Sequence, residues 1–300
     1  MLIFNHLFFF AATHTLHCVR AAGRATAAFS TATMSNLRSQ GLSVVVPTYE
    51  ESENIEALCQ RLFKNLRKGT GCDDVELLIV DDDSGEDTVK TKALVAKLAK
   101  EGHPIRIIVR SKSERSGLSS AVILGFDEAK YGTLVCMDAD LQHRPEAVPG
   151  LADAVLNGDA EFVVGSRNTA GGGIAAGWPL HRRIISWGAT TLARPLTAST
   201  DPMSGFFCLP RSVYARGKAS LNPIGYKIGL EITVRCRCTK LQNFPIQFQE
   251  RVAGESKLSM KQNFLYLQHL LYLYWAMYPV TIVVFCLALA AAIWKLIQRM

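Results

Sequence analysis

Two acidic runs in this 300-residue chain each follow a short apolar segment. Asp81-Asp82-Asp83 comes directly after residues 75–80, and Asp138-Ala139-Asp140-Leu141-Gln142 comes directly after residues 133–137. Side chains two residues apart point the same way in extended backbone, so Asp138, Asp140 and Gln142 are expected to present three oxygen atoms to one site. Oxygen ligands suit Mg²⁺ or Mn²⁺, which bind substrate phosphates. A lone Asp-x-Asp also occurs in solvated turns, but its place after a buried strand predicts a divalent-cation site.

Basic side chains are also needed if such a cation holds a diphosphate, and the sequence offers several. Arg167 follows another apolar segment, Arg182 and Arg183 come next, and Arg251 and Lys257 lie in a glycine-containing segment before the C-terminal apolar run. Such cations can donate charge-assisted hydrogen bonds to phosphate oxygens. We therefore expect the segment with Arg251 and Lys257 to close over a bound diphosphate as a flexible loop.

Five apolar segments rich in β-branched residues recur along the chain and set the positions of these polar groups. They cover residues 42–46, 75–80, 105–109, 133–137 and 161–164, and their starts lie about 30 residues apart, which is the length of a βαβ unit. Continuous apolar strands predict a mostly parallel sheet covered on both faces, hence an α/β domain. Apolar residues spaced by 3 and 4 from Ile55 to Leu66 predict a helix between the first two strands. Ligands of such domains bind beyond the carboxyl ends of the strands, where the acidic runs lie.

The composition excludes several classes of protein. With 49% hydrophobic and 20% charged residues, the chain is neither disordered nor collagen-like. The net charge is +7, but no Lys- or Arg-rich run marks a nucleic-acid surface, so no nucleic-acid partner is expected, and the eight cysteines lack the paired spacing of zinc sites. Val46 leads into Pro47-Thr48-Tyr49-Glu50-Glu51 without a glycine fingerprint, so a dehydrogenase or a P-loop kinase loses its main support.

Both ends of the chain are apolar, and the mean hydropathy is +0.14. Residues 276–294 contain one polar side chain, Thr281, and are expected to form a single transmembrane helix, between an amphipathic juxtamembrane segment (261–275) and a short tail (295–300). Residues 178–192 combine bulky apolar and basic side chains, which predicts an interfacial helix, although an amphipathic core helix has the same pattern. Residues 1–33 are interpreted as an N-terminal extension, dispensable or targeting, because Met34 offers a second start.

Ordered motifs between Leu42 and Lys257 resemble those of a known family. They are Val45-Val46-Pro47-Thr48-Tyr49, Val80-Asp81-Asp82, Gly117 to Ala121, Asp138 to His143, Gly165-Ser166-Arg167, Arg182 to Ser186, Ser204-Gly205-Phe206 and Gly254 to Leu258. On these motifs the chain resembles the dolichol-phosphate mannosyltransferases, inverting family-two glycosyltransferases with a Rossmann-like nucleotide-diphospho-sugar transferase (GT-A) fold. The resemblance implies a catalytic domain over residues 34–260. Glu50 departs from the Asn usual there, and Gly85-Glu86-Asp87 replaces a Pro-Asp-Gly.

The resemblance implies roles for individual residues. The donor GDP-mannose would be bound by Pro47, Tyr49, Glu51, Val80, Asp82, Asp138, Ala139, Asp140, Arg251 and Lys257. Asp138, Asp140 and Gln142 would hold Mg²⁺ or Mn²⁺ on the diphosphate, and Arg167, Arg182 and Ser186 would hold the acceptor phosphate. Asp140, Arg167 and Arg182 would form the catalytic set. Glu231 matches an acidic position of the family, to which we assign a hydrogen-bonding role and not that of a base.

The implied reaction is transfer of mannose from GDP-mannose to dolichyl phosphate with inversion, giving dolichyl β-D-mannosyl phosphate for glycosylation and GPI-anchor pathways. The resemblance further implies a single-pass protein of the endoplasmic reticulum membrane, with its catalytic domain facing the cytosol and with accessory membrane subunits allowed but not required. The residues alone leave open a dolichyl-phosphate glucosyltransferase that uses UDP-glucose, and a non-catalytic membrane subunit that binds a nucleotide sugar. Intact Asp138, Asp140, Arg251 and Lys257 argue against a catalytically dead copy.

Overall fold

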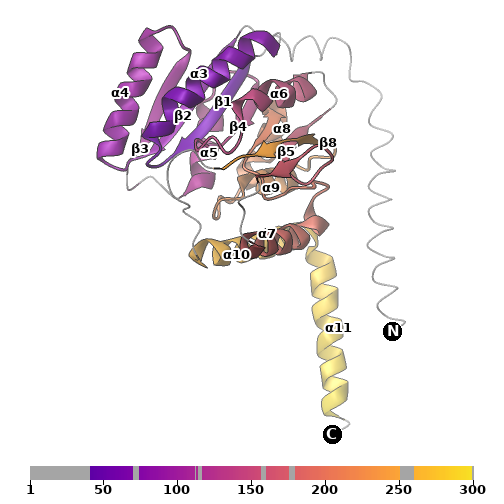
Figure 1. The fold of residues 1–300 in the computed structure, drawn as a ribbon. Coiled ribbons are helices and arrows are strands. Elements are labelled where there is room, and N and C mark those ends of the chain that lie inside the picture. The colour runs from indigo at the N-terminus through magenta and orange to yellow at the C-terminus, as the bar shows by residue number, and fades with distance from the viewer. Residues whose placement is uncertain are drawn as a thin grey trace.

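A seven-stranded sheet forms the centre of the main domain (Figure 1). The computed structural model describes residues 41–69, 74–111, 113, 117–156, 160–175, 180–250 and 260–298. The strands of the sheet are β1 (Leu42–Thr48), β2 (Val75–Asp82), β3 (Ile105–Arg110), β4 (Thr133–Cys136), β5 (Phe162–Ser166), β7 (Phe207–Pro210) and β8 (Leu241–Pro245). Their order is β3-β2-β1-β4-β7-β5-β8, and only β7 runs antiparallel to its neighbours. The predicted strands and the mostly parallel sheet are confirmed.

Helices cover both faces of this sheet or lie at the base of the domain. They are α3 (Ser52–Gly69), α4 (Glu86–Lys100), α5 (Leu118–Glu128), α6 (Val148–Leu156), α7 (Leu180–Ala193), α8 (Arg211–Gly217), α9 (Ile228–Arg235), α10 (Met260–Met277) and α11 (Pro279–Ile297), with short 3-10 turns η1 (Pro145–Ala147), η2 (Arg194–Leu196) and η3 (Lys218–Ser220). Of these, α7, α10 and α11 lie at the base of the domain or project from it (Figure 1). A second, two-stranded sheet pairs β6 (Gly173–Ile174) with β9 (Gln247–Phe248). The helix predicted between the first two strands is confirmed as α3.

Alternate residues of the central strands enter two different hydrophobic cores. Val44 and Val46 of β1 pack with α3, α4 and α6 on one face of the sheet, whereas Val45 packs with α5, α8 and α9 on the other. Leu78 and Val80 of β2 pack on the same face of the sheet as Val45. Because successive side chains of a strand point to opposite faces, a strand that is apolar throughout must be covered on both sides. The unbroken apolar runs of the sequence therefore determine the layered architecture.

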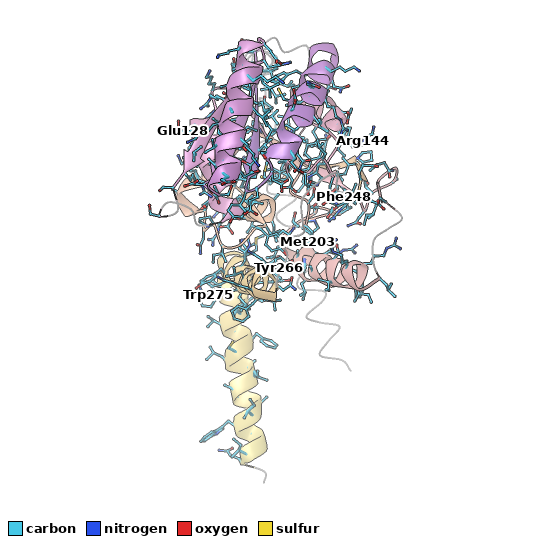
Figure 2. The ribbon with its side chains drawn as sticks, turned by 60° about the vertical axis from the view of Figure 1, so that its left-hand side comes forward. Glu128, Arg144, Met203, Phe248, Tyr266 and Trp275 are labelled. Carbon is cyan, nitrogen blue, oxygen red and sulfur yellow. The ribbon has the colours of Figure 1, made fainter. Side chains whose placement is uncertain are left out.

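A third hydrophobic cluster joins the main domain to the C-terminal helices. It contains Ala193, Leu196, Met203, Leu230, Val234, Tyr266, Leu270 and Leu273, all buried. Two tyrosine hydroxyls of α10 add hydrogen bonds to α7, from Tyr266 to the carbonyl oxygen of Ala189 at 2.7 Å and from Tyr274 to that of Leu192 at 2.8 Å. Helices α7 and α10 therefore pack against each other at the base of the domain, and α11 projects away from it (Figures 1 and 2).

The C-terminal apolar segment forms two helices, whose bounds differ by a few residues from the segments expected from the sequence. The predicted juxtamembrane segment 261–275 belongs to α10, which continues to Met277, and Pro279 starts α11 with a bend of 100° between the two. Proline lacks an N–H donor and clashes with the preceding turn, but it fits the first position of a new helix. Within the described residues, no single helix passes the length and apolarity criteria for a membrane span, whereas Lys261–Met277 and Pro279–Lys295 pass them together as a bent pair.

Candidate active site

The carboxyl ends of β1, β2 and β4 lie side by side at one edge of the sheet. Their parallel pairing places Pro47 opposite Val80 and Thr48 opposite Asp81, and β4 lies on the other side of β1. Pro47, Val80 and Asp82, three of the residues predicted for the nucleotide, therefore lie at the edge where ligands of open α/β sheets bind. Val80 itself is fully buried, and its side chain packs against Gly125 of α5, so only its backbone is left to face a ligand.

Asp82 is held at this edge by a buried arginine that sequence analysis missed. Arg110 at the end of β3 stands opposite Asp82 in the strand register, and its Nε donates to Asp82 Oδ1 at 2.7 Å. The rest of the guanidinium donates to the Ser120 hydroxyl at 2.6 Å and to the Gly117 carbonyl oxygen at 3.1 Å. With the Arg110 side chain only 5% exposed, this network fixes one orientation of the Asp82 carboxylate and balances its charge.

Asp138 and Asp140 follow β4 in a bend and not in extended backbone, which corrects the geometric argument for the three oxygens. Strand β4 ends at Cys136, the chain bends at residues 139–143, and Leu141 adopts a φ of 58°, so Asp138, Asp140 and Gln142 are not alternate residues of one extended strand. Asp140 is buried, and its Oδ1 accepts the Gln142 backbone N–H at 3.1 Å. Gln142 Nε2 donates to the Gln249 carbonyl oxygen at 3.0 Å, so Oε1 is the amide atom that can ligate a cation.

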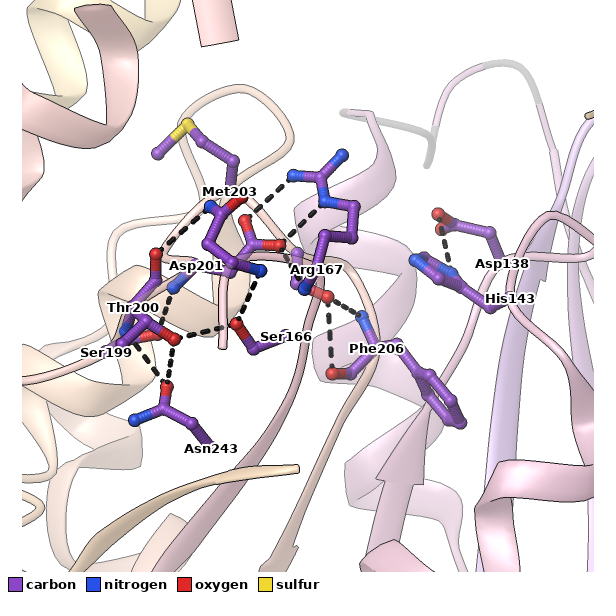
Figure 3. Close-up of polar contacts among 12 residues, drawn as sticks. Asp138, His143, Ser166, Arg167, Ser199, Thr200, Asp201, Met203, Phe206 and Asn243 are labelled. Atoms are coloured by element: carbon purple, nitrogen blue, oxygen red, sulfur yellow. Dashed lines mark hydrogen bonds and ion pairs between the residues drawn. The ribbon is translucent and has the colours of Figure 1, made fainter. Parts of the chain in front are cut away.

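Asp138 lies against a neutral histidine and a glycine. Its Oδ2 is 3.4 Å from His143 Nδ1, and the His143 ring packs 5.3 Å from the Phe206 ring (Figure 3). Burial lowers the pKa of His143 to about 4, so the imidazole carries no charge at neutral pH. A Cβ atom on Gly205 would stand 3.1 Å from Asp138 Oδ2, so a larger residue there would crowd the carboxylate. The side chain of Asp138 stays 35% exposed and is the accessible acid of the pair.

Arg167, at the end of β5, forms a bidentate ion pair with Asp201. Its Nε donates to Asp201 Oδ2 at 2.7 Å, its Nη2 to Oδ1 at 2.8 Å, and its backbone N–H also donates to Oδ2 at 3.1 Å (Figure 3). Burial acts to raise the pKa of Asp201, but the bonds and charge of Arg167 outweigh it and lower that pKa. The loop that carries Asp201 is fastened by Thr200, which contacts the Ser166 hydroxyl and the Asn243 amide oxygen. Asp201 was not identified from the sequence.

A pocket of about 520 Å³ opens beside this ion pair. It is lined by Arg167, Asn168, Ile174, Arg183, Ser186, Trp187, Thr190, Arg194 and Thr200. The structure thus brings together two of the three residues predicted for the acceptor phosphate, Arg167 and Ser186. Arg182 lies on α7 but is not part of this lining, where Arg183 and Arg194 supply the further cations. The pocket is a basic cavity at the base of the domain.

Comparison with known proteins agrees with this geometry. The model for "Glycosyl transferase family 2" matches residues 43–217. The chain belongs to glycosyl transferase family 2. It is 45% identical over 261 residues to the dolichol-phosphate mannosyltransferase of Mycosarcoma maydis, covering 84% of this chain and 87% of that one. It is 44% identical to that of Saccharomyces cerevisiae, covering 77% and 86%. The resemblance found in the motifs is confirmed.

Solved structures of low identity confirm the fold of this family 2 glycosyltransferase. Glucosyl-3-phosphoglycerate synthase from Mycobacterium tuberculosis, in complex with Mg²⁺ and uridine diphosphate, superimposes with a TM-score of 0.55 at 17% identity, covering 83% of this chain and 84% of that one. The same enzyme in complex with phosphoglyceric acid gives a TM-score of 0.54 at 18% identity, covering 79% and 80%. These similarities support the GT-A architecture expected for the domain.

The oxygen atoms of the side chains at the end of β4 suit a divalent cation that takes most of its other ligands from a substrate. Within the described ranges, no group of three or more His, Cys, Asp and Glu side chains could bind a metal ion by itself. Asp138 and Asp140 supply carboxylates and Gln142 an amide oxygen, and Mg²⁺ is commonly held by one or two carboxylates together with substrate phosphates and waters. This family 2 glycosyltransferase therefore offers an incomplete oxygen site of the kind that a bound diphosphate completes.

The remaining predicted residues are placed as follows. Glu51 directly precedes α3, and its carboxylate accepts a hydrogen bond from Asn54 Nδ2 at 2.8 Å. Ala139 is buried with the core beneath the sheet edge. Glu231 is buried and hydrogen-bonded, which agrees with the role expected for it. Arg251 and Lys257 lie outside the described residues.

Proposed function

We propose that this protein transfers mannose from GDP-mannose to dolichyl phosphate with inversion, giving dolichyl β-D-mannosyl phosphate. The observation that carries the proposal is the basic pocket lined by Arg167, Arg183 and Ser186, because α7, which supplies part of its lining, also exposes large apolar side chains such as Ile184 and Ile185. A pocket so placed suits an anionic group on a lipid that must reach a nucleotide diphosphate. Relatives at 42–45% identity bear the name dolichol-phosphate mannosyltransferase, which supports the same substrates.

The site residues divide the task between donor and acceptor. Asp82, oriented by Arg110, is placed to accept N–H groups of the guanine base, and a base without those donors would leave the carboxylate unpaired. Asp138, Asp140 and Gln142 would hold the divalent cation, which neutralises charge on the departing diphosphate. Arg251 and Lys257, in the segment that precedes α10, are proposed to bind the same diphosphate.

The acceptor needs orientation more than activation. A phosphate monoester has a second pKa near ~6 and is largely dianionic at neutral pH, so no general base is required. Arg167, with Ser186 and the arginines of α7, would hold this dianion so that one oxygen faces the anomeric carbon opposite the leaving diphosphate. Attack then forms the new C–O bond as the bond to GDP breaks, which inverts the anomeric centre.

The apolar surfaces at the base of the domain are proposed to contact the membrane. Large apolar side chains of α7 and α10 are exposed, namely Leu180, Ile184, Ile185, Trp187, Leu192, Phe264, Leu267, Leu271, Tyr272 and Trp275. Such faces suit helices that lie in the bilayer interface, and α11 is exposed and apolar along most of its length. We therefore place α7 and α10 on the surface of the endoplasmic reticulum membrane and α11 within it, as a single pass with the catalytic domain in the cytosol.

Sugar transfer by detergent-solubilised protein tests the reaction. Labelled GDP-mannose and UDP-glucose are supplied in parallel with dolichyl phosphate and Mg²⁺ or Mn²⁺. We expect mannolipid from the wild type, none after EDTA treatment, and about 10²-fold or greater loss for Asp140→Asn. Asp153→Asn, an exposed acid of α6, is the matched control and should behave as the wild type. Glucolipid in place of mannolipid would assign the UDP-glucose enzyme instead, and GDP binding without transfer would favour a non-catalytic subunit.

Membrane attachment has its own test. Flotation with liposomes, followed by carbonate extraction, should leave the full chain in the membrane fraction, and protease added outside sealed microsomes should degrade the catalytic domain. Release by carbonate would refute insertion of α11.

A further inference from the structure

Lys227 is a lysine whose ammonium group is bonded to the loop that carries Asp201. It directly precedes α9, its Nζ donates to the Met203 carbonyl oxygen at 2.5 Å, and it lies 4.4 Å from the centre of the Tyr226 ring. The charges that act on its ammonium group are those of Arg167, Asp138 and Asp201. The Met203 carbonyl lies in the segment 201–205, in which Asp201 pairs with Arg167 and Gly205 lies against Asp138, so the ammonium is bonded to the chain between these groups.

The position between these groups suits a cation that contacts phosphate. An ammonium has three N–H donors, and the Met203 carbonyl oxygen takes one of them. Burial is the main cause that lowers the pKa of Lys227 to about 8, and Arg167 lowers it further, while Asp138 and Asp201 act in the opposite direction. The group therefore remains mostly protonated at neutral pH. In the proposed reaction an acceptor dianion approaches a diphosphate, and a cation between them reduces their repulsion.

A buried acid–histidine pair connects this lysine to α10. Glu231 and His269 are each 1% exposed, and His269 Nε2 lies 2.5 Å from Glu231 Oε2. The other oxygen of Glu231 accepts the backbone N–H of Asn222 at 2.8 Å, and the backbone N–H of Glu231 donates to the Lys227 carbonyl oxygen at 3.2 Å. The Glu231 carboxylate therefore links Asn222, in the segment before Lys227, to the helix proposed to lie on the membrane, and the Glu231 backbone is one helical turn from Lys227.

Met203 provides a second connection between the same parts. Its carbonyl oxygen accepts the Lys227 ammonium, while its side chain packs with Tyr266 and Leu270 of α10 in the third cluster. Figure 2 shows Met203 next to Tyr266 where the catalytic domain meets the C-terminal helices. Any shift of α10 relative to α9 would disturb both the bond that Lys227 makes and the turn that carries it.

We infer that Lys227 is a further substrate-binding residue placed between the donor diphosphate and the acceptor phosphate, and that Glu231 and His269 are positioning residues through which α10 holds Lys227 in place. The inference rests on the proposed mannosyl transfer to dolichyl phosphate. It assigns α10 a part in catalysis besides attachment, because the helix supplies the group that fixes the start of α9.

The test is a double-mutant cycle on the full-length protein in detergent, with GDP-mannose and dolichyl phosphate as substrates. We expect Lys227→Met to lower kcat about 10²-fold, as for loss of one donor to a developing charge, while GDP affinity and the thermal midpoint stay near the wild-type values. His269→Leu should lower kcat about tenfold, and His269→Gln, which keeps a donor near the Nε2 position, should recover most of it. In the Lys227→Met background, His269→Leu should cause no further loss. Lys218→Met and Gln268→Leu are the matched controls.

The outcomes separate this inference from the proposed function. If the wild type makes no mannolipid, the proposed function itself is refuted, whatever the variants do. If the wild type is active, kcat of Lys227→Met within about threefold of it would overturn the role of Lys227. Equal loss from His269→Leu in both backgrounds would overturn the positioning role and leave a purely structural pair. If Lys227→Met does not fold, Lys227→Gln is measured instead, under the same criteria.

Discussion

Replacement of Asp201 by asparagine should destabilise this glycosyltransferase more than the loss of an ordinary surface charge. The Asp201 side chain is fully buried and that of Arg167 is 8% exposed, and the carboxylate accepts three N–H donors from Arg167. Asparagine keeps the shape but loses the charge, and it replaces one acceptor by a donor. The guanidinium is then left buried without its counter-charge, at a cost of about 3–5 kcal/mol.

The size of the effect can be measured as a thermal midpoint. Each kcal/mol shifts the midpoint of a domain of this size by about 2–4 °C, so a loss of about 3 kcal/mol should lower it by about 6–12 °C. Differential scanning fluorimetry in detergent gives the midpoint for wild type, Asp201→Asn, Arg167→Met and the double variant. The double variant should be more stable than the sum of the single effects predicts, by about 2 kcal/mol, because removing both partners leaves no unpaired buried charge.

A surface pair provides the control for this experiment. Glu56 pairs with Lys97 at 2.8 Å, with side chains 41% and 54% exposed, so Glu56→Gln should shift the midpoint by no more than about 2 °C. A shift for Asp201→Asn no larger than that of Glu56→Gln would refute the reasoning. Strict additivity of Asp201→Asn and Arg167→Met would also refute it, because the two side chains would then not act as a pair.

Two further predictions concern the donor site and pH. Arg110→Met removes the group that orients Asp82, so KM for GDP-mannose should rise about tenfold while KM for dolichyl phosphate stays unchanged, and equal changes in both constants would contradict this role. Burial acts to raise the pKa of Glu161, but hydrogen bonds from Arg216 and Thr239 outweigh it and hold that pKa at about 2. In the unfolded chain the pKa of a glutamate is about 4.3. The ionised Glu161 carboxylate therefore stabilises the folded state above about pH 4.3, and this stabilisation is lost as the pH falls toward 2. Glu161→Gln should therefore lower the thermal midpoint at pH 7 and approach the wild type only near pH 2, and a difference independent of pH would contradict the assignment.

The location of the site could be predicted from the sequence because its signals are local. Apolar runs mark β1, β2 and β4, and the acidic residues directly after the strands identify the edge at which we propose that a nucleotide diphosphate binds. No comparable pattern in the sequence predicts strand β7. It is four residues long and antiparallel, and it enters between β4 and β5 from a distant part of the chain. Its position in the sheet depends on pairing partners that no local pattern specifies.

The sequence by itself determined five of the sheet's strands and the helix after the first of them, which edge of the sheet is acidic, and which family the chain belongs to, because periodicity and motifs depend on neighbouring residues. Only the tertiary structure decided the partners of the functional side chains. Asp201 reaches Arg167 from 34 residues away, and His269 reaches Glu231 across 38 residues. It also decided the bend at residues 139–143 and the bend before Pro279. These features depend on how distant segments pack, and the energy of a buried ion pair or hydrogen bond exists only once both partners have left water together.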